Sequence, residues 1–262
     1  MTLRPHSKEW YLHLATLQTG YYYPWKSTLP PRNGEDVYLE MVRELLSPQK
    51  DALDAGCGHG ELTLSLAPFC RSLIAYDRVP AYIALAEQTA GEQNISNVRF
   101  ILWDSSEDVQ GRASIPAEDH SLDVLLSRRG PLNWIEDARR VGRPGAVLLQ
   151  LNPMEVAPPS WNDELPEPLR IMKHWESPIR HMVERRLEIG GLKMDSCWTF
   201  EVPEVFADPY QLYVKISWGF TLDEVPGWDE TRPILERIFA RYANAGGVSI
   251  QHGRFLWKAF VK

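Results

Sequence analysis

The stretch LDAGCGHGE at residues 53–61 decides which fold the chain is expected to adopt. A short apolar run leads into it, and residues 61–69, which follow, have the pattern of a helix. Its three glycines, at positions 56, 58 and 60, let the backbone turn sharply and let a ligand approach without a Cβ in the way. The stretch therefore predicts a ligand site where the first strand of an open α/β sheet meets its helix.

Short apolar runs alternate with helical patterns on both sides of this stretch. The runs that follow the glycines are residues 72–77, 98–104, 122–127 and 146–151, and the helical patterns are residues 37–46, 79–90 and 134–141. This alternation is typical of a parallel sheet with helices on both faces.

The composition changes after residue 151. Residues 152–168 are rich in proline and acidic side chains, which predicts a surface loop or lid outside the core. Later helices are predicted at residues 178–189, 209–218 and 232–244, and late strands at residues 196–202 and 248–261. An antiparallel hairpin of these two strands would complete a sheet of five parallel strands.

The glycine spacing argues against a dinucleotide cofactor. The dinucleotide fingerprint G-x-G-x-x-G would place its third glycine, or an alanine, at position 61. That position is Glu61, and a carboxylate at a helix N-terminus would repel a pyrophosphate bound there. NAD is therefore disfavoured.

The pattern Asp54-x-Gly56-x-Gly58-x-Gly60 resembles motif I of the class I S-adenosylmethionine-dependent methyltransferases. The resemblance covers about residues 51–151 and includes the turn Arg143-Pro144-Gly145 before the fifth strand. It implies S-adenosylmethionine as cofactor and S-adenosylhomocysteine as product. The cofactor-binding residues that it implies are Asp54, Gly56, Cys57, Gly58, Gly60, Asp77, Arg78, Asp104, Ser105 and Ser127.

The resemblance also assigns roles to the residues that end the next strands. It implies that Asp77 holds the two ribose hydroxyls, that Asp104 contacts the adenine amino group, and that Ser127 lies near the methionine end. Cys57 is expected to be a small loop residue, and His59 a solvent-facing one.

The resemblance further implies a Rossmann-like α/β fold with strand order 3-2-1-4-5-7-6. Its last strand, strand seven, would be antiparallel. Residues 1–35 would form an N-terminal cap and residues 36–262 the methyltransferase domain, with the cofactor half at about 36–151. Helical lids and substrate segments are expected at about 152–195 and 203–247, and residues 21–25 could cover the cofactor.

The acceptor side of the site is less well determined by the sequence. Arg128 and Arg129 follow the fourth strand, where amino-group methyltransferases of adenine or glutamine carry an (N/D)-P-P-(Y/F) tetrad that this chain lacks. The two arginines could clamp a carboxylate or phosphate, or could pair with Glu136 and Asp137. Trp218 is a further substrate candidate, and no spacing argument selects a base among His174, His181 and His252.

The composition narrows the classes of function. Hydrophobic residues make up 44% and charged residues 24%, which is ordinary for a globular chain with a sizeable core. Three scattered cysteines predict no disulfide framework and no structural metal site. No apolar run approaches the roughly 20 residues that span a bilayer, so a cytoplasmic, non-membrane protein is expected.

The predicted reaction is methyl transfer by in-line displacement to a small-molecule acceptor, with aromatic side chains of the lids lining its pocket. The formal net charge of −7 lacks the basic footprint of a nucleic-acid binder. Two alternatives stay open. One is an rRNA (guanine) methyltransferase without the usual Cys/His zinc module, and the other is a non-catalytic regulator that binds the cofactor.

Overall fold

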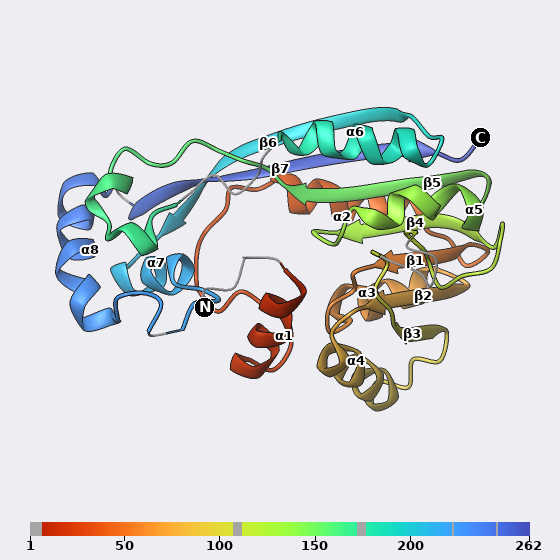
Figure 1. The fold of residues 1–262 in the computed structure, drawn as a ribbon, viewed down its shortest axis with the longest axis horizontal. Helices are drawn as coiled ribbons and strands as arrows, with labels where there is room; N and C mark the ends of the chain where they lie inside the picture. The colour runs from red at the N-terminus through yellow and green to blue at the C-terminus, as the bar shows by residue number, and fades with distance from the viewer. Residues whose placement is uncertain (1–6, 107–111, 172–176, 222, 245) are drawn as a thin grey trace.

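A seven-stranded sheet runs through the protein (Figure 1). The computed structural model describes residues 7–106, 112–171, 177–221, 223–244 and 246–262. The strands are β1 (Asp51–Ala55), β2 (Ser72–Asp77), β3 (Val98–Leu102), β4 (Leu122–Arg128), β5 (Gly142–Pro153), β6 (Met194–Phe206) and β7 (Val248–Phe260). Their order is β3-β2-β1-β4-β5-β7-β6. Six strands share one direction and β7 is antiparallel to both neighbours, so the predicted topology is confirmed.

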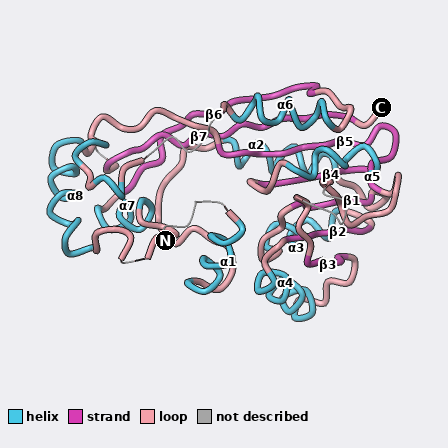
Figure 2. The backbone as a smooth tube through the Cα atoms, viewed as in Figure 1, coloured by secondary structure: helices cyan, strands magenta, loops and turns pink. Residues whose placement is uncertain are grey.

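Eight α-helices are described along the chain (Figure 2). They are α1 (Lys8–Leu17), α2 (Gly34–Leu45), α3 (Glu61–Leu66), α4 (Pro80–Glu92), α5 (Ala138–Val141), α6 (Ile179–Ile189), α7 (Pro209–Ile216) and α8 (Trp228–Tyr242). The helix expected at 134–141 is a 3-10 turn, Asn133–Asp137, followed by the short α5. The helix α1 lies within the predicted N-terminal cap.

The two faces of the sheet bury different sets of helices. Apolar side chains of α2, α3 and α4, such as Val42 and Ala86, pack on one face. Side chains of the 3-10 turn, α5 and α6, such as Trp134 and Val183, pack on the other face. Both faces are therefore covered, as the near-continuous apolar runs of the strands require.

The order of the strands creates a switch point beside β1. This strand pairs with β2 on one side and with β4 on the other, and all three run parallel. The connections after β1 and β4 therefore leave the sheet at the same edge and diverge, which opens a crevice there. This is the edge at which the sequence predicted a ligand site.

A second apolar core lies beyond the parallel strands, where β6 and β7 extend toward α7 and α8 (Figure 1). Phe206, Leu212 and Leu235 are buried in it. Trp161 and Leu165 join them, so the prediction that residues 152–168 lie outside the core is wrong for these side chains. The segment is rich in prolines, yet its Trp161 and Leu165 side chains are buried in this core.

The predicted lid at 152–195 also includes part of the main core. Ile179, Val183 and Leu187 on one face of α6 are buried against the sheet. That helix therefore covers the sheet while its start approaches the crevice.

Candidate functional site

A cavity of about 370 Å³ opens at the carboxyl ends of the parallel strands. Loops after β1, β2, β3 and β4 line it, together with residues from the N-terminal segment and α6. Its size lies within the range of small-molecule sites. Of the predicted cofactor residues, all but Gly60 and Ser127 line this cavity. Most residues that the sequence singled out for cofactor binding therefore line one cavity.

The glycine loop after β1 depends on conformations that other residues rarely adopt. Gly56, Gly58 and Gly60 have φ of 75°, 56° and 82°. A Cβ on Gly60 would lie 2.9 Å from the Cβ of Ala86 and 3.0 Å from the ring of Phe100. Gly60 therefore allows α3 to pack closely, while Gly56 and Gly58 border the cavity.

Asp54 is a buried carboxylate at the end of β1. It is 2% exposed, and its Oδ2 accepts a hydrogen bond of 2.6 Å from the Thr63 hydroxyl. Burial raises the pKa of Asp54 to about 6, although the bond from Thr63 and the nearby charge of Arg128 act in the opposite direction. Asp54 can therefore change its charge just below neutral pH.

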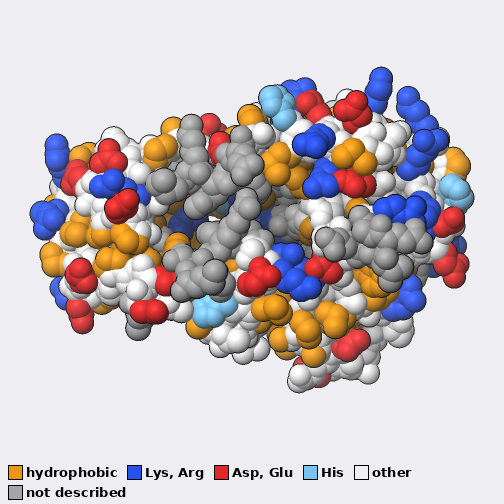
Figure 3. All heavy atoms as spheres, in the orientation of Figure 1, with side chains coloured by type: hydrophobic (Ala, Val, Ile, Leu, Met, Phe, Trp, Pro, Cys, Tyr) orange, Lys and Arg blue, Asp and Glu red, His pale blue; other side chains and the backbone are white. Residues whose placement is uncertain are grey.

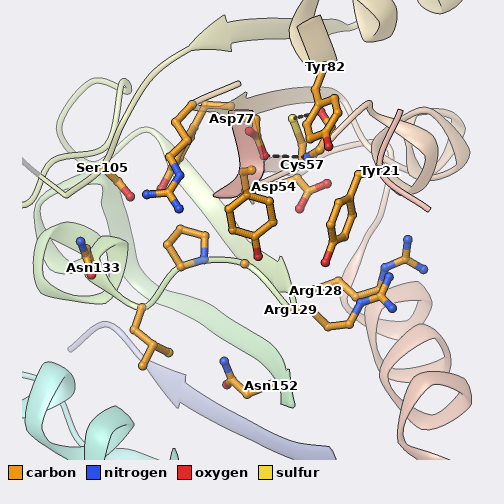
Figure 4. Close-up of a pocket in the computed structure, with 18 of the residues that line it drawn as sticks. Tyr21, Asp54, Cys57, Asp77, Tyr82, Ser105, Arg128, Arg129, Asn133 and Asn152 are labelled. Atoms are coloured by element: carbon orange, nitrogen blue, oxygen red, sulfur yellow. Dashed lines mark hydrogen bonds between the residues drawn. The ribbon is translucent and has the colours of Figure 1, made fainter. Parts of the chain in front are cut away.

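Asp77 ends β2 and faces the same cavity (Figure 4). Its two oxygens accept backbone hydrogen bonds from Gly58, at 2.9 Å, and Val79, at 3.0 Å. Burial raises the pKa of Asp77 above its ordinary value despite these bonds. The Arg78 backbone is a further hydrogen-bond partner of this carboxylate, and an ionised carboxylate offers about four acceptor sites, so Asp77 can still accept a bond from a ligand.

Asp104 lies after β3, beside Ser105 and Ser106. Its Oδ1 accepts bonds from the Ser106 backbone and hydroxyl, at 3.1 Å and 2.6 Å. Burial acts to raise the pKa of Asp104, but these bonds hold it below its ordinary value. Lys8 on α1 lies 3.4 Å from Asp104, so the N-terminal helix reaches this end of the cavity.

Ser127 does not line the cavity, whereas Cys57 does. Ser127 is fully buried and its hydroxyl donates to the Ala55 carbonyl at 2.8 Å, so its expected place near the methionine end of the cofactor stays a prediction. This bond couples the ends of β4 and β1. Burial raises the pKa of the Cys57 thiol well above its ordinary value, which agrees with its interpretation as an inert loop residue.

Aromatic side chains of the N-terminal segment form one wall. Tyr11, Tyr21 and Tyr23 line the cavity, although the sequence had singled out only residues 21–25. The guanidinium of Arg78 lies 5.3 Å from the centre of the Tyr11 ring. His59 was expected to face solvent, but its Nδ1 accepts a 3.0 Å bond from the Tyr21 backbone and burial lowers its pKa. That prediction is wrong because the wall folds over the glycine loop.

The paired arginines lie on the side of the cavity that holds Tyr21 (Figure 4). Arg128 lies 3.8 Å from Glu61, and Arg129 lies 3.8 Å from Glu35. The alternative in which they pair with Glu136 and Asp137 is wrong, because Glu136 pairs with Arg186 and Asp137 pairs with Arg140. The arginines instead join α2 and α3 to the rim of the cavity.

Trp218 lies behind the wall rather than in the cavity. Its ring centre is 5.1 Å from that of Tyr23 and 5.2 Å from that of Trp10, so it supports the wall from outside. Two of the three histidines considered as a base do not line the cavity: His181 is exposed and His252 bonds to Glu204 at 3.3 Å. His174 lies outside the described residues.

Several lining residues carry no signal in the sequence. Trp103, Asn133, Asn152, Met182 and Arg186 also line the cavity. They come from separate segments that only the tertiary fold brings together. Within the described ranges, no group of three or more His, Cys, Asp or Glu residues could hold a metal ion, and no helix is long and apolar enough to cross a membrane.

Comparisons with known proteins agree with this site. Residues 52–145 match the family described as a methyltransferase domain. The 23S rRNA (uracil(1939)-C(5))-methyltransferase RlmD of Pseudomonas entomophila (strain L48) is 32% identical over 147 residues. The alignment covers 51% of this chain and 32% of that protein, so the chain spans about a third of the length of this curated relative.

Two solved structures share the fold over most of the chain. A functionally unknown protein from Deinococcus radiodurans R1 has a TM-score of 0.66 and 20% identity, covering 97% of this chain and 100% of that one. A candidate methyltransferase from Bacillus halodurans C-125 has a TM-score of 0.58 and 16% identity, covering 87% and 99%. These likenesses concern the fold.

Proposed function

The chain belongs to the class I S-adenosylmethionine-dependent methyltransferases, and we propose that it binds S-adenosylmethionine in the cavity and methylates a small-molecule acceptor. The observation that carries the proposal is the meeting of three acids, Asp54, Asp77 and Asp104, around one cavity. Each follows a different parallel strand, so together they can bind a long ligand at separate points.

The chemistry of these residues fits the cofactor. Asp77 lies at the cavity surface as an acceptor that suits the ribose hydroxyls. Tyr82, which also lines the cavity, has a buried hydroxyl without a hydrogen-bond partner among the described residues. Asp104 and Ser105 can bind the adenine edge. A nucleoside supplies hydroxyl and amino groups that can bond to these side chains.

Arg128 fits the methionine end better than the acceptor. Arg128 and Asp54 line the same cavity. A carboxylate and a guanidinium in one cavity can match the ammonium and carboxylate of an amino acid. We therefore assign Asp54 and Arg128 to that part of the cofactor.

The protein's contribution to the reaction would be alignment and exclusion of water. S-adenosylmethionine supplies an activated methyl group when it is bound. The tyrosine wall would shield the cavity from solvent, and the strand-end residues would hold the cofactor in line with the acceptor, an effect worth roughly 7–11 kcal/mol in favourable cases. An acceptor that already presents a lone pair needs no base.

Ribosomal RNA is the second candidate acceptor, because the RlmD relatives act on 23S rRNA by name. The formal net charge of −7 opposes it. On the face seen in Figure 3, acidic side chains lie among the basic ones, including those over α6. This mixture offers no continuous basic track for a phosphate backbone on that face.

Transfer of a radiolabelled methyl group into a cell extract tests the proposed function. The extract is separated into RNA, protein and low-mass fractions, and we expect label in the low-mass fraction. Label mainly in ribosomal RNA would favour the second candidate. Bound cofactor with no label in any fraction would support a regulator instead.

The pKa of Asp54 predicts a pH dependence for cofactor binding. Because its pKa is raised to about 6, the carboxylate is ionised at pH 7 and mostly protonated at pH 5. If the ionised form binds the cofactor ammonium, affinity should fall by about tenfold from pH 7 to pH 5. Calorimetry across this range measures the change. Asp54→Asn should bind weakly and with a flatter profile, whereas a wild-type affinity that is equal at both pH values would contradict the assignment.

A further inference from the structure

The end of the cavity beside the tyrosine wall carries an excess of positive charge. Glu35 accepts a 2.7 Å bond from Arg254 and also lies 3.8 Å from Arg129. One carboxylate therefore serves two guanidiniums, and the shorter contact belongs to Arg254, which does not line the cavity. The positive charge that remains belongs to Arg129 at the cavity surface.

Arg129 itself has unused hydrogen-bonding capacity. Its side chain is 15% exposed, and its Nε is buried with no hydrogen-bond partner among the residues described. Its backbone has φ of 62°, which is uncommon for a residue with a Cβ, and its N–H donates to the Leu151 carbonyl at 2.7 Å. The fold thus holds this arginine in an uncommon backbone conformation, with Tyr23 and Glu35 beside its head group and an Nε that has no partner among the described residues, a combination that favours a functional role.

The neighbouring side chains suit a planar anion. The guanidinium of Arg129 lies 4.7 Å from the centre of the Tyr23 ring. Burial acts to raise the pKa of Tyr23, but Arg129 and Arg254 hold it below its ordinary value, which reflects the same positive field. The Asn152 oxygen accepts a 3.0 Å bond from Trp257, so its amide NH₂ remains as a donor.

The three strand-end acids and Arg129 lie in different parts of the cavity. Asp54, Asp77 and Asp104 line the part that we assign to the cationic cofactor, together with Arg78. Arg129, Tyr21 and Tyr23 lie together at the other side. An acceptor with a negative group would complement the charge of Arg129 in this second part.

We propose that Arg129 binds an oxyanion of the methyl acceptor, a carboxylate or a phosphate, with Asn152 as a further donor and Tyr23 as an aromatic wall. The inference rests on the proposed function, because it concerns the acceptor part of the same site. It differs from the role given to Arg128, which would bind the carboxylate of the cofactor.

Small anions of known structure test this assignment directly. Protein saturated with S-adenosylhomocysteine is titrated by calorimetry with benzoate, phenyl phosphate and benzamide, which have the same ring. We expect at least one anion to bind about tenfold to a hundredfold more tightly than neutral benzamide. Preference for benzoate over phenyl phosphate would identify a carboxylate site, and the reverse a phosphate site.

Two matched variants separate the neighbouring arginines. Arg129→Asn removes the guanidinium while tolerating the positive φ, and Glu35 keeps Arg254 as partner. It should abolish the preference for anions and leave S-adenosylhomocysteine affinity within about twofold. Arg128→Asn should instead weaken S-adenosylhomocysteine binding and keep the preference for anions. Arg129→Lys, which keeps the charge, should restore part of the preference.

The outcomes distinguish this inference from the proposed function. Equal binding of benzoate and benzamide, no anion binding up to about 10 mM, or an unchanged preference in Arg129→Asn would overturn the role of Arg129. Failure of the wild-type protein to bind S-adenosylhomocysteine in the first titration would instead overturn the proposed function, and the inference with it.

Discussion

Asp77→Ala should weaken the binding of S-adenosylmethionine by about 30- to 1000-fold, or roughly 2–4 kcal/mol. The carboxylate would accept two charged hydrogen bonds from the ribose, and alanine removes both. Asp77 already holds the loop and the next helix through Gly58 and Val79. These contacts fix its oxygens before a ligand arrives, so little ordering is left to oppose binding.

Calorimetry with S-adenosylmethionine measures this loss. Burial raises the pKa of Asp77, so its charge opposes folding at neutral pH and the variant should remain folded. Asp77→Asn keeps the shape of the side chain but not its charge, so its affinity should lie between those of the wild-type protein and Asp77→Ala. Asp195→Ala changes an exposed carboxylate outside the cavity lining and serves as control. Unchanged affinity in Asp77→Ala would sink the cofactor assignment, as would binding of NAD by the wild-type protein.

Glu204→Ala should lower the free energy of unfolding by about 3–5 kcal/mol at pH 7. Glu204 is 3% exposed and accepts bonds from Trp25, at 2.9 Å, and Ser27, at 2.7 Å. Lys215 lies 3.1 Å away and His252 lies 3.3 Å away. Alanine would leave the ammonium of Lys215 without its carboxylate and would remove the bonds from Trp25 and Ser27, so that the backbone pair of Thr28 and Val205 remains to hold the N-terminal segment on β6.

The same carboxylate predicts how stability depends on pH. Burial acts to raise the pKa of Glu204, but the bond with His252 and the charge of Lys215 hold it well below its ordinary value. A lowered carboxyl pKa stabilises the folded state above the unfolded pKa of about 4.3, and this contribution is lost as the pH falls further. The gap in stability between wild type and Glu204→Gln should therefore shrink below about pH 4.

Urea unfolding measures both the loss of unfolding free energy at pH 7 and its dependence on pH. Glu204→Gln retains the shape of the side chain and an acceptor oxygen, so its loss at pH 7 should be smaller than that of alanine. The control is Glu236→Gln on α8, where an exposed pair with Arg232 predicts a change below about 1 kcal/mol. A Glu204→Ala protein as stable as this control would show that the cluster does not hold the segment in place.

The parts of the site that the sequence predicted share a physical cause. Asp54, Asp77 and Asp104 each follow an apolar run, and parallel strands bring their carboxyl ends to one edge. Their meeting therefore depends only on recognising the strands. The conformation of the glycine loop can also be predicted from local sequence, because glycine tolerates the positive φ that the loop requires.

The parts that were missed depend on long-range packing. Asn152 enters the cavity because β5 ends beside β4, and Met182 enters because α6 covers that edge. Nothing in their immediate sequence marks either one. The partner of Ser127 could not be predicted for a related reason: its position along β4 is local, but the bond of its hydroxyl to Ala55 depends on the neighbouring strand.

In the later half of the chain, too, long-range packing decides which residues are buried in the core. Trp161 and Leu165 stand among prolines and acids, which predict a surface loop, yet both are buried. Their burial requires α7, α8 and the extended ends of β6 and β7, all of which follow them in the chain. A local pattern cannot report a partner that lies so far away.

The bond between Trp25 and Glu204 joins residues 179 positions apart, and it has a consequence during protein synthesis. At about 5–20 residues per second, a ribosome needs roughly 10–35 s to travel from one residue to the other. Tyr23 and Trp25 are synthesised well before Trp218, which they contact in the folded protein. For that interval the nascent chain displays an aromatic segment with its final partners still unmade, which is the kind of stretch that chaperones at the ribosome bind.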